Sequence, residues 1–231
     1  MGEHRDAAAQ VVVVDLDAPE LETADLHHLA KVLRLRAGER VCATDGSGGW
    51  RMCAFTGAAA LEPLDGPRRA APPPYEISVG FAPIKGDRPE LVVQKLTELG
   101  VDRILVVPTR RSVVRWDGER ATRHLERLRR VALGACGQCR RLWVPAVELS
   151  SLADLDGDGV VCADAGGRPL GTGDRTVLIG PEGGWEPDEV ATRDAVALGP
   201  HVLRAETAAI AAATLLGALR AALVAPSAGQ G

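Results

Sequence analysis

Two loops near the C-terminal end of the chain hold the residues best suited to chemistry. The first, "LIGPEGGWEPDE", covers residues 178–189, and the second, "LGPHVLRAETAAIAAATLL", covers residues 198–216. Each loop is predicted to follow a strand and to open a helix, and ligands of open α/β sheets bind beyond the carboxyl ends of strands. Glycine lets backbone groups approach a ligand directly. The pair predicts a binding site made largely of backbone, although a tight turn and a dense alanine-rich helix would explain either stretch alone.

Other motifs that would carry different chemistry are missing or incomplete. The sequence has no G-x-G-x-x-G dinucleotide fingerprint, no G-x-x-x-x-G-K-[ST] phosphate loop and no G-x-S-x-G nucleophile. Residues 154–159, "DLDGDG", begin like a calcium loop, but Ala165 stands where the final glutamate is needed. The "CGQC" of residues 136–139 has no second pair, and His27 and His28 have no third ligand. We therefore expect no metal.

Positive charge is concentrated in the middle of the chain. Residues 103–141 contain eleven arginines against three acidic residues, whereas the whole chain has a formal net charge of −4. Four of these arginines, at 120, 123, 127 and 130, repeat at helical spacing, roughly 140° from an apolar stripe that includes Leu125 and Leu128. A basic patch on an acidic body is typical of a protein that contacts phosphate on one face, although a solvated helix face would show the same pattern.

The composition is that of a globular protein. Apolar residues make up 46% and charged residues 25% of the 231 residues. No apolar run approaches the roughly 20 residues of a membrane helix, and the charged N-terminus does not resemble a signal peptide. The five cysteines are mostly isolated among apolar residues, which favours reduced thiols. We expect a cytoplasmic protein with no membrane contact.

The elements that must position these loops fall into two predicted domains. Residues 66–74, "GPRRAAPPP", are a proline-rich linker, so we place one domain at 1–70 and another at 75–231. Before the linker, a buried strand at 10–15, a short helix at 23–34 and a hairpin around "GSGG" indicate a small β-barrel with one helix.

Strands and helices alternate after the linker, which predicts a mostly parallel α/β sheet. The expected strands are at 75–83, 102–109, 143–149, 159–165 and 176–180. The expected helices are at 87–100, 117–136, 186–199 and 206–223, with a turn of helix at 151–155 and a short strand or turn at 201–204.

At this level of detail the chain resembles the RsmE-type 16S ribosomal RNA uridine-N3 methyltransferases of the SPOUT superfamily. The resemblance covers nearly the whole chain and is most specific in "IGPEGGWEPDE" followed by "LGPHVLRAETA". Three further stretches match: "HHLAKVLRLRAGE" (27–39), "KGDRPELVVQKLTELGVDRILVVPTRRSVV" (85–114) and "GQCRRLWVPAV" (137–147). One position departs from the family, because Gly137 stands where a glutamate is usual.

The resemblance implies a fold, a cofactor and partners. A PUA-like barrel that helps hold RNA would precede a SPOUT-type, mostly parallel α/β domain whose C-terminal part forms a trefoil knot. The knot would bind S-adenosylmethionine, and the protein would act as a homodimer. Its substrate would be a uridine of 16S rRNA in the small ribosomal subunit. Methylation of another RNA nucleotide, or RNA binding without catalysis during ribosome assembly, are the alternatives.

The resemblance also assigns roles to residues of this chain. Two loops and one following residue would hold the cofactor: Gly180, Pro181, Glu182, Gly183, Gly184, Leu198, Gly199, Val202, Leu203 and Thr207. Residues expected to face RNA are Arg34, Lys85, Arg88, Arg110, Arg111, Gln138 and Arg141.

Two residues of the second loop are the expected catalytic groups. The Arg204 guanidinium would stabilise the anion that uracil becomes when N3 loses its proton. Glu206 would either accept that proton, or pair with Arg204 and cap the last helix.

Overall fold

The computed structural model describes residues 3–86 and 88–224, which divide into two compact units. The first unit contains the chain up to Pro73 together with Leu133–Val144. The second contains Pro74–Ala132 and the chain from Pro145 onward. Residues 133–144, which the sequence places in the second domain, therefore belong to the first unit.

The first unit is built around a five-stranded sheet. Its strands run in the order β1-β2-β3-β4, and β5 also pairs with β3. β1 is parallel to β2, and the other pairs are antiparallel. The strands are β1 (Ala9–Val12), β2 (Arg40–Thr44), β3 (Gly49–Phe55), β4 (Leu61–Pro63) and β5 (Arg68–Arg69).

The hairpin and the helix expected in this unit are both present. Asp45 Oδ1 accepts the N–H groups of Ser47 (2.7 Å) and Gly49 (2.9 Å), which fixes the turn between β2 and β3. A 3₁₀ turn, η1 (Glu3–Asp6), precedes β1. The predicted helix forms as α1 (Thr23–His27), continued by a π-helical turn, η2 (His28–Val32).

Residues 133–144 complete part of the core of the first unit. Leu142 is buried in a cluster with Ala7, Cys42, Trp50 and Met52. The side-chain amide of Gln10 donates to the carbonyls of Cys136 (3.2 Å) and Arg141 (2.7 Å). These contacts explain why residues distant in sequence share one unit.

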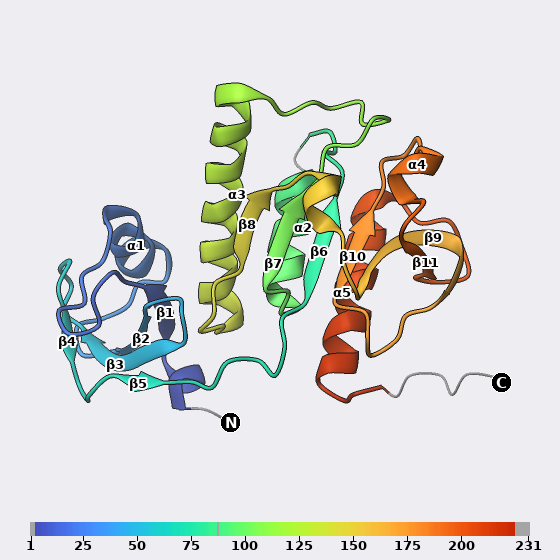
Figure 1. Cartoon of the computed structure of the whole chain (residues 1–231). Helices are drawn as coiled ribbons and strands as arrows, with labels where there is room; N and C mark the ends of the chain where they lie inside the picture. Colours follow the sequence, from blue (N-terminus) through green and yellow to red (C-terminus); the bar gives the residue numbers. More distant parts are fainter. Residues whose placement is uncertain (1–2, 87, 225–231) are drawn as a thin grey trace. The chain divides into compact units, whose positions relative to one another are not determined.

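The second unit contains a six-stranded sheet in which every pair of neighbouring strands is parallel (Figure 1). The strand order is β11-β9-β10-β6-β7-β8. The strands are β6 (Ser78–Phe81), β7 (Arg103–Val106), β8 (Ala146–Leu149), β9 (Val160–Pro169), β10 (Thr176–Ile179) and β11 (Asp194–Ala197). The parallel α/β architecture predicted from the alternating pattern is confirmed.

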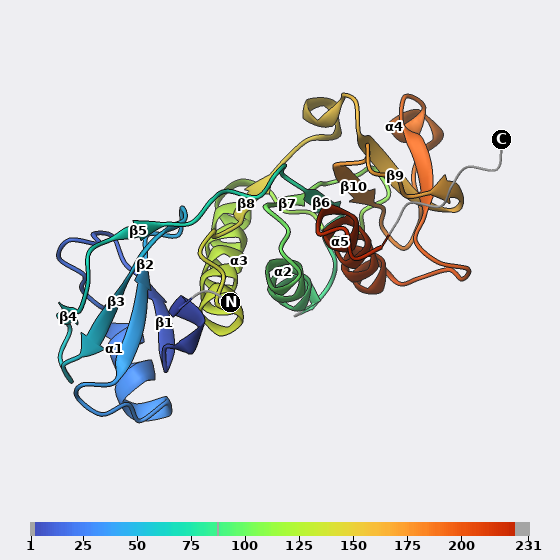
Figure 2. The same cartoon turned by 90° about the horizontal axis from the view of Figure 1, so that it is seen from below.

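Helices α2 (Arg88–Glu98) and α5 (Ala205–Arg220) lie side by side against the sheet (Figure 2). The alanines of α5 permit this close packing, and Ala209, Ala212 and Ala213 are fully buried. The end of α5 is held by Arg220, which pairs with Asp102 and donates to the carbonyl of Gly100 (2.6 Å).

The long helix α3 (Gly118–Cys139) has the two faces that its sequence predicts. Leu128 and Ala132 are buried, and the arginines at 120, 123, 127 and 130 are exposed. Residues of α3 up to Ala132 belong to the second unit, and those from Leu133 onward belong to the first.

The prediction of one helix over residues 186–199 is wrong. The segment forms a single short helix, α4 (Pro187–Val190), and then the edge strand β11. Val196 of β11 is fully buried, and the strand satisfies its backbone by pairing with β9. Tertiary pairing thus overrides the helical pattern of the sequence. The turn at 151–155 forms η3 (Leu152–Leu155), whereas 201–204 form no strand.

Strand β9 leaves its ladder with β11 for five residues. β11 pairs first with Val161 and Cys162 and then with Arg168 and Pro169, so residues 163–167 lie between two paired stretches. Gly167 returns the chain to the ladder, and a Cβ there would lie 2.4 Å from the backbone nitrogen of Val196. We call residues 163–167 the β9 excursion.

Candidate functional site

A pocket of about 650 Å³ lies beyond the carboxyl end of β10 and beside the middle of β9. Three segments line it: the β9 excursion, the glycine-rich loop 180–184, and residues 198–205 before and at the start of α5. Its volume is in the range of small-molecule and cofactor sites. Of the ten residues predicted to hold a cofactor, eight line the pocket: Gly180, Pro181, Glu182, Gly184, Leu198, Gly199, Val202 and Leu203.

The glycine-rich loop needs glycine at two positions for different reasons. A Cβ on Gly180 would lie 2.9 Å from the indole of Trp185, which also lines the pocket. Gly184 has a φ of +73°, which side chains rarely adopt, and its N–H donates to the carbonyl of Pro181 (2.8 Å). Gly183 does not line the pocket and faces Arg111.

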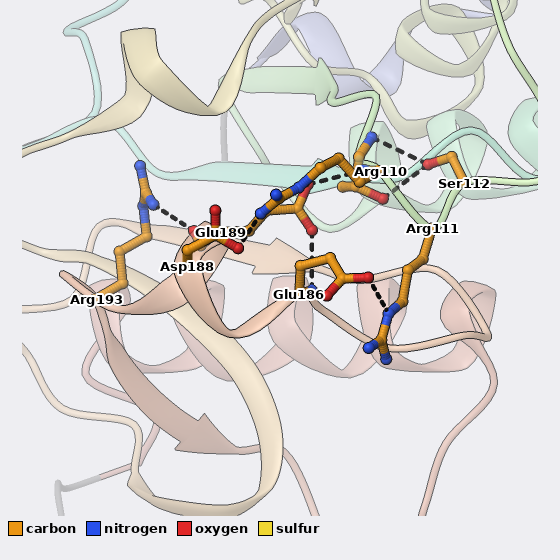
Figure 3. A network of polar contacts seen from close by, with 8 residues as sticks. Arg110, Arg111, Ser112, Glu186, Asp188, Glu189 and Arg193 are labelled. Atoms are coloured by element: carbon orange, nitrogen blue, oxygen red, sulfur yellow. Dashed lines mark hydrogen bonds and ion pairs between the residues drawn. The ribbon is translucent and has the colours of Figure 1, made fainter.

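Arg110 and Arg111, in the loop after β7, fasten the glycine-rich loop and α4 (Figure 3). Arg111 donates to the carbonyl of Gly183 (3.0 Å) and to the carboxylate of Glu186 (2.8 Å), while Arg110 pairs with Asp188. The bond from Arg111 lowers the pKa of Glu186, and the bond from Arg110 lowers the pKa of Asp188. We call these five residues the clasp: Arg110, Arg111, Gly183, Glu186 and Asp188. An RNA contact by Arg110 or Arg111 stays a prediction.

Glu189 stabilises the clasp through two hydrogen bonds to backbone N–H groups. Its side chain is 8% exposed, and its two oxygens accept the N–H of Arg110 (2.8 Å) and of Glu186 (3.0 Å). Glu189 is not among the site residues predicted from the sequence. A glutamate three residues after the start of a helix is a usual capping position, and that signal was present in "WEPDE".

Arg204 is the charged side chain of the second loop that lines the pocket. It is exposed, and it has neither a hydrogen bond nor an ion pair with any residue of 3–86 or 88–224. Val202 is 90% exposed although it lines the pocket, whereas Leu198 and Leu203 pack against the core. The second loop therefore presents an apolar wall and a guanidinium available for a ligand.

The β9 excursion supplies a wall that sequence reasoning missed. Ala163, Asp164 and Ala165 line the pocket, and Asp164 Oδ1 accepts the N–H of Gly166 (2.9 Å). His201 of the second loop also lines the pocket and was missed. The signal for Asp164 was its position near the end of the predicted strand 159–165, where α/β sheets bind ligands.

Glu206 and Thr207 do not line the pocket, although their neighbours Arg204, Ala205 and Ala208 do. The ion pair of Glu206 is with Arg88, at 3.8 Å, and not with Arg204. Arg204 itself is the residue before α5, and that position has no side-chain capping bond. Arg88, which the sequence predicts to contact RNA, therefore lies next to residues that line the pocket.

The other residues expected at RNA fall in both units. Lys85 belongs to the second unit, and Arg34, Gln138 and Arg141 belong to the first. The first three are exposed and Arg141 is partly buried. Gly137, the departure from the family, lies against β1: a Cβ there would be 3.0 Å from the carbonyl oxygen of Gln10.

In the part of the chain that the structure describes, no three His, Cys, Asp or Glu residues are grouped as a metal would require. Burial raises the pKa of the Cys136 thiol in "CGQC" to about 12, which is unlike an activated redox thiol. None of the described helices combines the length and the apolar character that a bilayer crossing requires.

Comparison with known proteins identifies the family. A model described as RNA methyltransferase domain matches residues 71–217, and one described as RNA methyltransferase PUA domain matches residues 21–60. A curated relative from Mycobacterium bovis, "Ribosomal RNA small subunit methyltransferase E", is 33% identical over 220 residues, covering 83% of both chains. The chain belongs to the ribosomal RNA small subunit methyltransferase E family.

Further members of the methyltransferase E family match over similar lengths. The Bacillus subtilis relative is 26% identical over 80% of this chain and 83% of its own. A Neisseria gonorrhoeae methyltransferase E structure bound to S-adenosyl methionine has a TM-score of 0.79 at 27% identity, covering 91% of this chain and 97% of its own. A Legionella pneumophila putative methyltransferase with bound cofactor SAM also has a TM-score of 0.79, at 26% identity and 90% and 96% coverage. The predicted family and its α/β domain with a PUA domain are confirmed.

Proposed function

We propose that this protein transfers a methyl group from S-adenosylmethionine to N3 of a specific uridine in 16S rRNA of the small ribosomal subunit. Family membership supports the reaction class. The observation that carries the proposal is the pocket itself, which joins the β9 excursion and the two loops around the unpaired guanidinium of Arg204.

The pocket residues fit the cofactor chemically. Leu198 and Leu203 offer apolar surface for a flat base, and glycines 180 and 199 expose backbone groups to it. Asp164 has a carboxylate oxygen free to accept a hydroxyl or an ammonium group, since only its Oδ1 receives a bond from within the described residues. Bound S-adenosylmethionine supplies a methyl group on a sulfonium, which is an electrophile.

The protein's part in the reaction is positioning and charge stabilisation. Uracil N3 carries a proton and becomes a nucleophile when that proton leaves. The new N–C bond forms in line with the breaking C–S bond, so orientation contributes much of the rate. Arg204 stabilises the negative charge spread over the uracil oxygens. Glu206 does not line the pocket and pairs with Arg88, so we do not assign it the proton.

The decisive experiment methylates small subunits from a strain that lacks this modification. We expect mass spectrometry of the digested rRNA to show one new 3-methyluridine. A different methylated nucleoside would favour the alternative RNA target. S-adenosylmethionine binding without any methylated product would favour a non-catalytic assembly protein.

The Arg204→Ala variant tests the proposed catalytic guanidinium. We expect turnover to fall by about 10²-fold or more, as with the removal of one oxyanion donor, while cofactor affinity changes little. Single-turnover assays and calorimetry with S-adenosylmethionine measure the two effects. Normal turnover in this variant would overturn the assignment.

Several parts of the proposal rest on the family alone. These are the trefoil knot, the homodimer, and RNA contacts by Arg34, Lys85, Gln138 and Arg141, whereas the proposed cytoplasmic location rests on the composition of the chain. Sedimentation of the purified protein, and salt-dependent RNA binding of the arginine and lysine variants, test the dimer and the contacts.

A further inference from the structure

Helix α3 carries a row of exposed arginines opposite its buried face, within the part that belongs to the second unit. Ala121, Leu128 and Ala132 of that part are buried in the core. The arginines follow one another at steps of three, four and three residues, so they share one side of the helix over about 15 Å of its axis. We call Arg120, Arg123, Arg127 and Arg130 the α3 stripe.

The stripe differs from the other arginines of the second unit in its partners. Most arginines of this unit outside the stripe form an ion pair with a carboxylate: Arg88, Arg103, Arg110, Arg111, Arg168, Arg193 and Arg220. Within the stripe, Arg127 pairs with Glu90 of α2 at 2.8 Å. Arg120, Arg123 and Arg130 form no ion pair with any residue of 3–86 or 88–224.

Acidic residues near the stripe do not neutralise it. Glu119 and Glu126 lie on the same helix, at the spacings at which ion pairs form, yet neither pairs with any of the described residues. Residues 115–130 contain six arginines and three acidic residues, so their formal charge is 6 − 3 = +3, whereas that of the whole chain is −4. The stripe therefore presents concentrated positive charge to a ligand.

The side chains around the stripe suit phosphate groups better than bases or an apolar protein surface. No large apolar side chain between residues 120 and 130 is exposed. Trp116, the nearest aromatic residue, is 6% exposed and stacks on His124 with ring centroids 4.6 Å apart. Base stacking and the centres of protein interfaces need accessible aromatic side chains. A guanidinium instead binds phosphate oxygens through two parallel N–H groups.

We propose that the α3 stripe is a docking surface for the phosphate backbone of the substrate rRNA, at nucleotides other than the one that is methylated. The inference rests on the proposed function. No stripe arginine lines the pocket, and none is among the residues that the family resemblance assigns to RNA. The stripe contributes affinity that does not depend on sequence, and the pocket carries out the chemistry.

The main test measures how the binding of small ribosomal subunits from a strain lacking the modification depends on salt. Each lost phosphate contact reduces the slope of log affinity against log salt by about 0.7 to 0.9. We expect Arg120→Gln/Arg123→Gln to reduce that slope by about 1.5 and to weaken binding about 10-fold near 0.1 M salt. An unchanged slope in a folded variant would overturn the inference.

The matched control is Lys95→Gln/Arg103→Gln, which removes the same charge from the second unit. Both side chains are partly exposed, at 37% and 41%, and each pairs with a glutamate, at 2.8 Å and 3.1 Å. We expect its slope to stay within about 0.5 of the wild type, since neither cation is free to bind phosphate. A reduction as large as that of the stripe variant would show an effect of net charge alone and would overturn the inference.

Kinetics separate docking from catalysis and from folding. Losing a contact made equally in the ground and transition states raises KM, so we expect Arg120→Gln/Arg123→Gln to raise KM for subunits and to keep kcat and cofactor affinity within about twofold. Thermal unfolding is expected to stay near that of the wild type, because the two side chains are exposed and unpaired. A lowered kcat with normal KM would contradict a docking role.

A 20-base-pair RNA duplex of unrelated sequence identifies the partner. We expect Arg120→Gln/Arg123→Gln to weaken duplex binding by a factor similar to that for subunits. Normal duplex binding with weakened subunit binding would indicate a ribosomal protein partner and would overturn the inference. A wild-type protein that binds subunits without methylating them would refute the proposed function, while the binding comparison would still decide the role of the stripe.

Removing an acid beside the stripe gives a prediction of opposite sign. Glu126 lies three residues from Arg123 and four from Arg130, so its charge would repel a phosphate bound there. We expect Glu126→Gln to strengthen duplex binding about two- to threefold near 0.1 M salt. Asp158→Asn is the control, because Asp158 is exposed, unpaired among the described residues and outside α3. Equal affinities in the two variants would show that no phosphate approaches the stripe.

Discussion

The guanidinium of Arg111 donates to the carbonyl of Gly183 in the glycine-rich loop and to the carboxylate of Glu186, the residue before α4. We expect Arg111→Gln to weaken S-adenosylmethionine binding about 3- to 10-fold, which corresponds to losing one charge-assisted bond that orders the loop. Calorimetry measures the change. Arg115→Gln is the matched control, because Arg115 is exposed and has no bond or ion pair with the described residues. Equal affinities in both variants would show that the clasp does not order the pocket.

The pH dependence of the clasp follows from its carboxylates. The pKa values of Glu186 and Asp188 are lowered in the folded protein, so their ion pairs stabilise the loop above the ordinary carboxyl range. The contribution is lost only as the pH falls through the lowered values. We therefore expect the affinity gap between wild type and Arg111→Gln to stay constant between about pH 6 and about pH 8.

Single residues were predictable from sequence where local backbone needs decided them. Gly180 and Gly184 stood out because a strand followed by glycines requires a tight turn, and Arg204 stood out through the family motif. Asp164 and Trp185 were missed because their positions depend on how β9 leaves its ladder and how an indole packs on Gly180. Neither arrangement leaves a periodic signal in the sequence.

At the scale of elements, the β9 excursion depends on one close approach between backbones. A Cβ on Gly167 would overlap the backbone atoms of Ala195 and Val196 in the paired strand β11, so one of the two backbones would have to shift. We expect Gly167→Ala to lower the free energy of unfolding by about 1–3 kcal/mol, as overpacking does. Urea titration measures it.

Gly173→Ala is the control for that experiment. Gly173 is exposed and a Cβ there would meet nothing within 4 Å, so we expect a change below about 0.5 kcal/mol. A Gly167→Ala protein as stable as this control would mean that the excursion can be rebuilt without glycine. Because Asp164 belongs to the same excursion, Gly167→Ala is also expected to weaken cofactor binding.

Most element types were predictable from the sequence, but the type formed by residues 186–199 was not. Long amphipathic stretches such as residues 117–136 gave a correct helix, because the core face repeats at the helical period. The helix prediction for residues 186–199 was wrong because acidic residues typical of a helix start precede β11, a strand only four residues long. The strand forms because it can pair with β9, and that pairing depends on the tertiary fold.

At the scale of the whole molecule, residues 133–144 follow the linker in sequence but belong to the first unit. We expect a fragment of residues 1–73 to fail to fold alone, because it lacks Leu142 and the backbone carbonyls that Gln10 bonds to. Circular dichroism and amide exchange of the fragment test this. A cooperative unfolding transition in residues 1–73 would show that the segment is dispensable.

The domain boundary illustrates what composition can and cannot predict. The proline-rich stretch 66–74 was predicted to be a linker without regular structure, but Arg68 and Arg69 form strand β5, which pairs with β3, and the first unit extends to Pro73. The return of residues 133–144 to the first unit was invisible, because it depends on contacts between residues more than 100 positions apart.

The shared use of α3 also limits how such a chain could exchange parts with its relatives during evolution. A single genetic crossover in the linker would bring in a foreign N-terminal unit without the residues 133–144 that complete it. A functional hybrid would need a second crossover inside the gene segment for α3, where Gly137 already lies against the backbone of Gln10. The N-terminal unit and the end of this helix are therefore expected to be inherited together.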